Sequence, residues 1–424
     1  MRSLSLTCVP CLALTLFLNP VVSLAQSEME TVLGWDHQLF PSYLIATASI
    51  KPSAGENPSD ILGDPKGMMG VRLVASRDNE PVKVTVSCSE FIEDSEYSGI
   101  LPTKDVSYNV MPKVRYRYDR LSQCRQATPA SITLTVQIGS GKPKVISETV
   151  TFRSISDCPL AVRLGDSEVD LSFTFAAYVN EQHPFVDKML REALDLGIVD
   201  RFTGYQSKSA EEVIRQAYSL WDLMVARDVR YSSITTTAAD SNDVASQNVR
   251  LIEDSVNNTQ ANCVDGSVLF VSLLRKIGIE ARLVLVPGHC YVAFAADPAG
   301  EIYFGLETTM VDAEVELLDE IPELFENAVD VSFQESASWA SFLAAIEHGT
   351  SELGKAAEKF SDPKSNYHMI DVAQARKNGV LPIPFTSSET FVSFDHSAYV
   401  SNDSSEEEGE EEHDEEEQDE GDAE

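Results

Sequence analysis

Positive charge is scarce in this sequence, and no apolar run is long enough to cross a membrane. The 424 residues include 32 lysines and arginines against 68 aspartates and glutamates, which gives a formal net charge of −36. A chain this acidic repels the phosphates of nucleic acids and of anionic lipids, so we expect no nucleic-acid partner. A membrane helix needs about 20 apolar residues, whereas the run at residues 12–18 is much shorter. We therefore expect no membrane span in the mature chain.

Histidine and cysteine are also few. No pair of the seven histidines has the HExxH or HxH spacing of metal ligands, so we expect no metal site and no cofactor. Two of the seven cysteines lie in the first 25 residues, and the remainder is odd, so at least one thiol stays unpaired unless two chains are linked. One disulfide within the N-terminal half is a plausible pairing. The five remaining cysteines are Cys88, Cys124, Cys158, Cys263 and Cys290.

The first 25 residues have the pattern of a secretory signal peptide. Arg2 provides a basic start, residues 12–18 form a short apolar segment, and Ser23 and Ala25 place small residues at the −3 and −1 positions of a cleavage site. We therefore expect residues 1–25 to be removed and the mature protein to be exported, either to a periplasm or out of the cell.

The C-terminal end is a low-complexity acidic segment. Residues 403–424 contain 15 acidic residues and no basic one. Without apolar side chains to bury, such a segment cannot form a core, so we predict a disordered acidic tail there and a linker at residues 386–402.

Residues 26–165 are predicted to form a β-rich N-terminal domain. Short runs alternate apolar and polar residues, and turn residues separate them, which is typical of a sandwich-like β domain. Residues 26–67 are expected to be rich in loops. One role considered for this domain is to bind an extracytoplasmic protein partner. The runs lie at residues 71–74, 82–86, 113–118, 132–136 and 149–152.

The apolar period changes to that of helices in residues 170–385. One helix is expected to begin at His183-Pro184, and a second is marked by Ser209 and Glu212, the residues of a capping box. Residues 264–277 are apolar almost all round, which predicts a buried helix that ends at Gly278. Strands are expected at 281–286, 290–295 and 302–306, a polar loop at 235–262, and helices near 313–328 and 336–347.

Three residues in this region have the chemistry of a thiol catalytic site. Cys263 lies in the first turn of the buried helix, where the helix dipole stabilises a thiolate. His289 begins one predicted strand, and Glu307 follows the next. Adjacent antiparallel strands bring such side chains together, so nucleophile, base and orienting acid are expected to meet in one place.

Four segments also resemble the transglutaminase-like superfamily, in its bacterial exported type. They are VRYS at 229–232, ANCVDGSVLFVSLLRKIGIEARLV from Ala261, PGHCYVAF from Pro287 and GLETTM from Gly305, and their order and spacing match the family. The resemblance implies an α+β, papain-like fold and acyl transfer through a thioester. It assigns Cys263 as nucleophile, His289 as general base and Glu307 as orienting acid. Asp312, a few residues further on, is the alternative to Glu307 as the acid.

The rest of the predicted site is less sharply defined. The backbone N–H of Cys263 is one candidate oxyanion donor, and the side chain of Gln260 or Asn262 is a second. Cys290 follows His289 in the same strand and points to the other face, so we expect it to pack in the core. Trp221 is expected in the core, and Asp265 near the start of the helix is expected to interact with the helix dipole.

These patterns lead to two hypotheses of different kinds. The first is an exported transglutaminase-like cysteine hydrolase or acyltransferase that acts on amide bonds of peptides or proteins, with hydrolysis favoured. The second is a catalytically silent transglutaminase-like scaffold whose β-rich domain binds a partner. The motifs do not separate a protease from a deamidase or a crosslinking transferase, because all three share the thioester.

Overall fold

The computed structural model describes residues 29–51, 59–233, 241, 243–311, 313–316, 321–362 and 365–394. The predicted signal peptide, the acidic tail and the alternative acid Asp312 lie outside the described residues. No helix within the described ranges is both long enough and apolar enough to span a bilayer.

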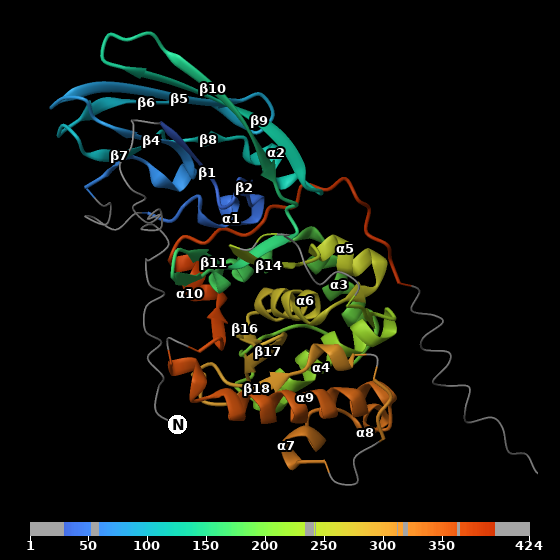
Figure 1. Cartoon of the computed structure of the whole chain (residues 1–424). Coiled ribbons are helices and arrows are strands. Elements are labelled where there is room, and N and C mark those ends of the chain that lie inside the picture. Colours follow the sequence, from blue (N-terminus) through green and yellow to red (C-terminus); the bar gives the residue numbers. More distant parts are fainter. Residues whose placement is uncertain are drawn as a thin grey trace, which may run out of the picture.

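Two sheets form the N-terminal part and lie as two layers in Figure 1. Strand alternation explains the packing, because Val82, Val84 and Val86 of one strand are all buried while Pro81 and Lys83 are exposed. The first sheet has the order β1 (Glu30–Leu33), β4 (Met69–Val74), β7 (Ser107–Met111), β3 (Ile61–Gly63). The second has the order β2 (Gln38–Leu39), β10 (Lys144–Phe152), β9 (Thr128–Ile138), β5 (Glu80–Cys88), β6 (Ile92–Leu101), β8 (Arg115–Tyr116).

One expectation for the N-terminal part gains detail, and another was wrong. Within residues 29–51 and 59–67, the segment expected to be rich in loops also contributes three strands and helix α1 (Pro41–Thr47), whose residues 41–46 are buried. The predicted strand at 113–118 shrinks to Arg115–Tyr116, and helix α2 (Tyr118–Ser122) begins directly after it. Alternation over six residues was too short a signal to locate the end of that strand.

The C-terminal part is built around a buried helix and an antiparallel sheet. Helix α6 (Cys263–Lys276) packs on β16 (Ala281–Val286) and β17 (His289–Ala295), and the sheet order is β18 (Tyr303–Leu306), β17, β16, β19 (His368–Asp371). Figure 1 shows α6 at the centre of this part, with α3 (Pro184–Asp195) and α5 (Ile252–Asn258) beside it. The fold class is therefore as predicted, a papain-like α+β region preceded by a strand-rich one. The other helices are α4 (Ala210–Ala226), α7 (Glu323–Glu326), α8 (Val331–Gln334), α9 (Ala337–Ala356) and α10 (Val372–Lys377).

Four local expectations differ from the structure here. The expected polar loop at 235–262 contains strand β14 (Val244–Asn248) and helix α5. Among the described residues of 313–328, the expected helix is reduced to α7, whereas the one near 336–347 extends to residue 356 as α9. Ser209 does cap α4 by accepting the backbone N–H of Glu212, but its hydroxyl donates to the Glu211 carboxylate.

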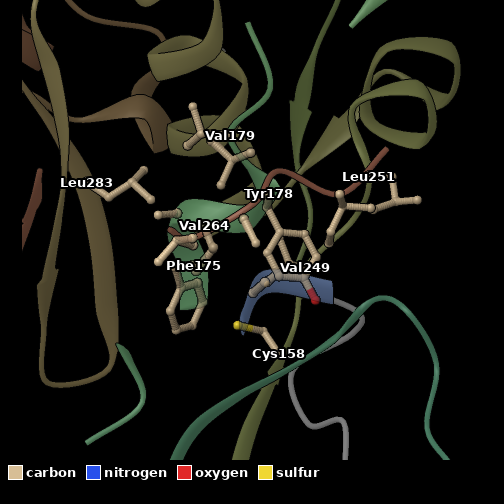
Figure 2. Packing of buried hydrophobic residues seen from close by; sticks show 14 of the residues in the cluster. Cys158, Phe175, Tyr178, Val179, Val249, Leu251, Val264 and Leu283 are labelled. Atoms are coloured by element: carbon tan, nitrogen blue, oxygen red, sulfur yellow. The ribbon is translucent and has the colours of Figure 1, made fainter. Parts of the chain in front are cut away.

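One hydrophobic core joins the two parts. Strand β11 (Asp157–Leu164) follows directly on the N-terminal sandwich, yet it pairs with β14 of the C-terminal part and with β12 (Ser167–Asp170). Figure 2 shows the packing at this junction, where Cys158 of β11 and Val264 of α6 contribute to one cluster. One cluster of buried side chains has members in both parts, from Leu33 near the N-terminus to Phe391 near the C-terminus. The sandwich therefore packs directly against the region that carries Cys263.

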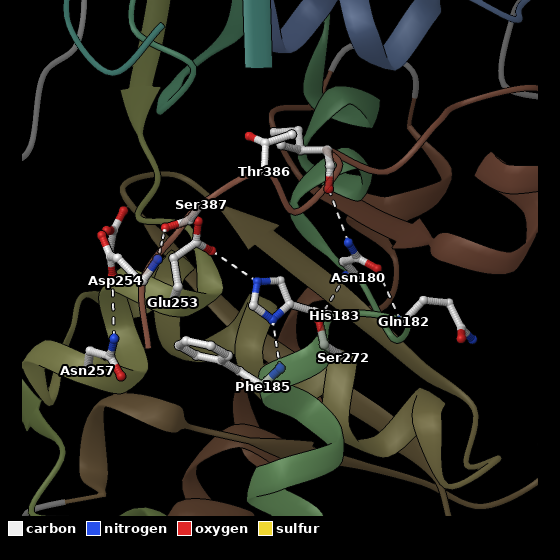
Figure 3. Close-up of polar contacts among 12 residues, drawn as sticks. Asn180, Gln182, His183, Phe185, Glu253, Asp254, Asn257, Ser272, Thr386 and Ser387 are labelled. Atoms are coloured by element: carbon white, nitrogen blue, oxygen red, sulfur yellow. Dashed lines mark hydrogen bonds and ion pairs between the residues drawn. The ribbon is translucent and has the colours of Figure 1, made fainter. Parts of the chain in front are cut away.

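A C-terminal strap, defined as residues 378–394, runs back along both parts and is drawn in red in Figure 1. Its backbone N–H groups bind the N-terminal part at Ala46 (3.0 Å from Leu381 N) and the C-terminal part at Ala177 (2.7 Å from Ile383 N). The ring of Phe385 in the strap lies 4.6 Å, centroid to centroid, from that of His183. His183 is the N-cap of α3 and is hydrogen-bonded to Glu253, as Figure 3 shows.

Candidate active site

A reciprocal capping box places Cys263 at the first position of α6. The side-chain Oδ1 of Asn262 accepts the backbone N–H groups of Val264 (2.8 Å) and Asp265 (2.9 Å), and Asp265 Oδ2 accepts the N–H of Asn262 (2.9 Å). This arrangement satisfies the N–H groups that a helix start leaves unpaired. The use of the Cys263 backbone N–H as an oxyanion donor stays a prediction.

Asp265 is the buried anchor of this helix start. Its side chain is fully buried, and it also accepts the backbone N–H of Arg250 at 2.8 Å and the Arg250 guanidinium at 2.7 Å. A buried carboxylate with these partners is satisfied, so Asp265 holds the helix terminus in place. The sequence suggested only a dipole interaction, although the Asn-x-x-Asp spacing was a readable sign of the cap.

The two side chains predicted as further oxyanion donors lie in different surroundings. The carbonyl end of the Asn262 side chain is occupied by the cap just described. Gln260 is exposed in the short strand β15 (Gln260–Ala261), which pairs in parallel with β13 (Arg230–Tyr231). Their role as oxyanion donors stays a prediction.

His289 and Glu307 meet across neighbouring strands. Strands β17 and β18 pair antiparallel, and His289 Nε2 lies 2.6 Å from Glu307 Oε2. Gly288 before the histidine has φ +77°, a backbone conformation that favours glycine. The other carboxylate oxygen of Glu307 accepts the backbone N–H of Thr309 (3.1 Å) and its hydroxyl (2.7 Å). Glu307 is therefore fixed at both oxygens and is almost completely buried.

The third member of the site is the Cys263 thiol. Its hydrogen bond with His289 is the largest of the influences that raise the pKa of His289 to about 10, followed by the hydrogen bond to Glu307, while burial acts in the opposite direction. Burial would raise the pKa of Glu307, but hydrogen bonds from His289 and Thr309 hold it below its ordinary value. These hydrogen bonds favour the protonated form of His289, which lies between the Cys263 sulfur and the Glu307 carboxylate.

Three groups therefore lie in the order thiol, imidazole, carboxylate. They come from the start of α6, the start of β17 and the residue after β18. An imidazole beside a cysteine sulfur, with a carboxylate on its other side, is the arrangement of a nucleophile, its base and an orienting acid. Tyr231 of β13 also lies close enough for the charges of Cys263 and Glu307 to raise its pKa, after burial as the larger cause.

Residues 199–300 match the family model of the transglutaminase-like superfamily. This part of the protein is a transglutaminase-like domain. The matched segment contains Cys263 and His289, whereas Glu307 lies beyond its end. Among the curated proteins, none matches the chain.

Two other predictions for the transglutaminase-like domain are confirmed by burial. Cys290 has no exposed surface, and burial is the main cause that raises the pKa of its thiol well above the ordinary value. Trp221 is completely buried in α4. Within the described ranges, His, Cys, Asp and Glu side chains form no group of three that is arranged to hold a metal ion.

Sequence reasoning missed two residues that lie around the acid, Glu307. Thr309 binds Glu307 directly, and the Thr-Thr pair after the acid was its visible signal. Gly266 lies one turn after Cys263, where a Cβ atom would be 3.1 Å from Thr308 Oγ1 and 3.3 Å from Thr308 Cβ. A small residue is thus needed for α6 to approach the segment that carries Glu307.

Replacing Gly266 by valine is expected to push α6 away from Thr308 and to lower the melting temperature, since overpacking costs about 1–3 kcal/mol. Alkylation of Cys263 should slow as well, because the shift separates the thiol from His289. Gly354→Val is the matched control, since a Cβ there meets no atom within 4 Å. An unchanged melting temperature in Gly266→Val would show that a side chain fits between α6 and Thr308 without displacing them.

Proposed function

We propose that this protein is an exported cysteine hydrolase or acyltransferase that acts on amide bonds of peptides or proteins through a thioester. The observation that carries the proposal is the line of contacts from Cys263 through His289 to the buried Glu307. The signal-peptide pattern at residues 1–25 supports export.

The first half of the reaction forms the acyl-enzyme. The Cys263 sulfur attacks the amide carbonyl carbon, and the carbonyl oxygen takes the negative charge of the tetrahedral intermediate. The intermediate collapses as the C–N bond breaks, and His289 gives its proton to the departing nitrogen. The products are a free amine, or ammonia, and a thioester on Cys263.

The second half returns the thiol. His289, now neutral, takes a proton from a water molecule, whose oxygen attacks the thioester and releases a carboxylic acid and the Cys263 thiolate. A primary amine in place of water gives transamidation instead. Hydrolysis is favoured because water is abundant outside the cell and no residue of the site marks an amine-binding position.

The test is to incubate the mature chain with fluorescein-labelled casein, with and without dansylcadaverine as an added amine. Small fragments would indicate peptide-bond hydrolysis, released ammonia would indicate deamidation, and dansyl-labelled casein would indicate transamidation. We expect product in at least one assay and none after the protein is treated with iodoacetamide. No product from a protein whose Cys263 is intact and accessible would instead favour the silent scaffold.

A further inference from the structure

Strand β18, which ends just before Glu307, lies at the edge of its sheet. It pairs with β17 on one side, and among the described residues no strand covers its other side. Helix α9 covers that edge, and Figure 1 shows it running alongside β18. An edge strand has backbone N–H and C=O groups that no neighbouring strand pairs with. Helix α9 can bind these groups of β18 and so hold the end of the strand in position.

The helix and the strand touch backbone to backbone at two glycines. A Cβ atom on Gly349 of α9 would lie 2.6 Å from the carbonyl carbon of Gly305 and from the nitrogen of Leu306. A Cβ atom on Gly305 would lie 2.1 Å from the carbonyl oxygen of Gly349. Side chains do not fit at this crossing, so α9 lies as close to β18 as two backbones allow.

Two hydrogen bonds set the register of this crossing. The backbone N–H of Glu307 donates to the carbonyl oxygen of Ala345 in α9 at 3.1 Å. The backbone N–H of Gly305 donates to the hydroxyl of Thr350 at 3.1 Å. The acid is thus bound to α9 through its own main chain, while its side chain binds His289 and Thr309.

Helix α9 is itself held by the centre of the domain. Trp339 and Phe342 pack against Tyr218 and Trp221 of α4 with ring centroids 4.7–5.9 Å apart. The indole N–H of Trp221 donates to the hydroxyl of Ser341 at 2.9 Å. A rigid connection therefore runs from α4 through α9 to the acid.

We propose that α9 is the positioning element of the acid, and that Gly349 and Thr350 are positioning residues that set where the Glu307 carboxylate meets His289. This inference rests on the proposed function, which requires that meeting. Both residues lie outside the segment 199–300 that matches the superfamily.

The test compares Gly349→Ala with Gly354→Ala in the same helix. A Cβ at Gly354 meets nothing within 4 Å, so this control carries the same chemical change without the crossing. The two readouts are the NMR titration of the His289 ring and the rate of Cys263 alkylation by iodoacetamide at pH 6. Both are measured on folded protein well below its melting temperature.

Gly349→Ala is expected to lower the pKa of His289 by about one unit or more, which is a tenfold or larger change in its protonation equilibrium. Cys263 alkylation should also slow, because the displaced imidazole no longer lies against the sulfur. Gly354→Ala should leave both at the wild-type value. A folded Gly349→Ala variant with the wild-type His289 titration would overturn the proposal, because a merely stabilising glycine shifts the melting temperature alone.

If Gly349→Ala does not fold, Thr350→Val tests whether α9 positions the Glu307 carboxylate. It removes the hydroxyl that binds Gly305 and keeps the shape, so the pKa of His289 should fall, and Thr350→Ser should restore it. Wild-type titration in Thr350→Val would overturn the role of α9. Failure of the proposed function would look different, because the wild-type protein would then give no product in the casein assays, whatever Gly349→Ala does to the His289 titration.

Discussion

Replacing Cys263 by alanine is expected to reduce turnover of the casein substrate to background, a loss of about 10³-fold or more. The reason is that no other described group near His289 can form the thioester, since the thiol of Cys290 is buried and its pKa is raised well above the ordinary value. Product formation over time in both proteins measures the effect, and intact-mass analysis after iodoacetamide treatment shows whether Cys263 is the modified site.

Cys88→Ala serves as the control for this experiment. Cys88 is buried in β5 of the N-terminal sandwich, so its loss should affect stability but neither turnover nor rapid alkylation. Turnover that survives in Cys263→Ala would refute the thioester mechanism, and the domain would then act without its thiol.

Glu307→Gln is expected to give the second largest loss, about 10²–10⁴-fold in kcat, by analogy with the removal of the orienting acid from a hydrolase triad. The change keeps the shape of the side chain but removes the charge that helps to raise the pKa of His289 to about 10. The pKa of His289 should therefore fall toward 6.5, and the pH–rate profile should shift in the same direction.

Thr309→Val provides a graded comparison, because it removes only the hydroxyl that donates to the far oxygen of Glu307 at 2.7 Å. We expect a smaller loss of rate and a smaller fall in the pKa of His289. Wild-type rates in Glu307→Gln would show that the carboxylate has no part in the reaction, and the site would then be a thiol–imidazole pair.

The His289 imidazole and the Glu307 carboxylate make the free energy of unfolding depend on pH. His289 has a raised pKa in the folded state, so its contribution is complete below about pH 6.5 and is lost as the pH rises toward 10. Glu307 has a lowered pKa, so its contribution is present above about pH 4.5 and is lost as the pH falls through its folded value. Urea midpoints measured from pH 4 to 10 should decline at both ends, and Glu307→Gln should flatten both declines.

The secondary structure next to Cys263 was predicted best from the sequence. Helix 264–277 and strand 281–286 were found within one residue, because continuous apolar runs ended by glycine leave few alternatives. Predictions were wrong where short polar segments gain their structure from partners. Strand β14 is one case, because it forms by pairing with β11, which is distant in sequence.

The support of Glu307 was harder to foresee, for a similar reason. The bond from its backbone to Ala345 joins residues that no local pattern relates, and the contact of Gly305 with Gly349 depends on the angle at which a helix crosses a strand. A glycine in a sequence signals freedom or close approach, but not which segment approaches.

The C-terminal strap has a consequence for how the protein is made. The hydrogen bond between Leu381 and Ala46 joins a residue of α1 to one that is synthesised after most of the chain. Contacts between such distant residues form late and slow the folding reaction. Until residue 381 has been synthesised, the nascent chain therefore lacks the segment that completes the packing of its N-terminal part. If the proposed export takes place with the chain unfolded, this late contact helps to keep the chain open until translocation is nearly complete.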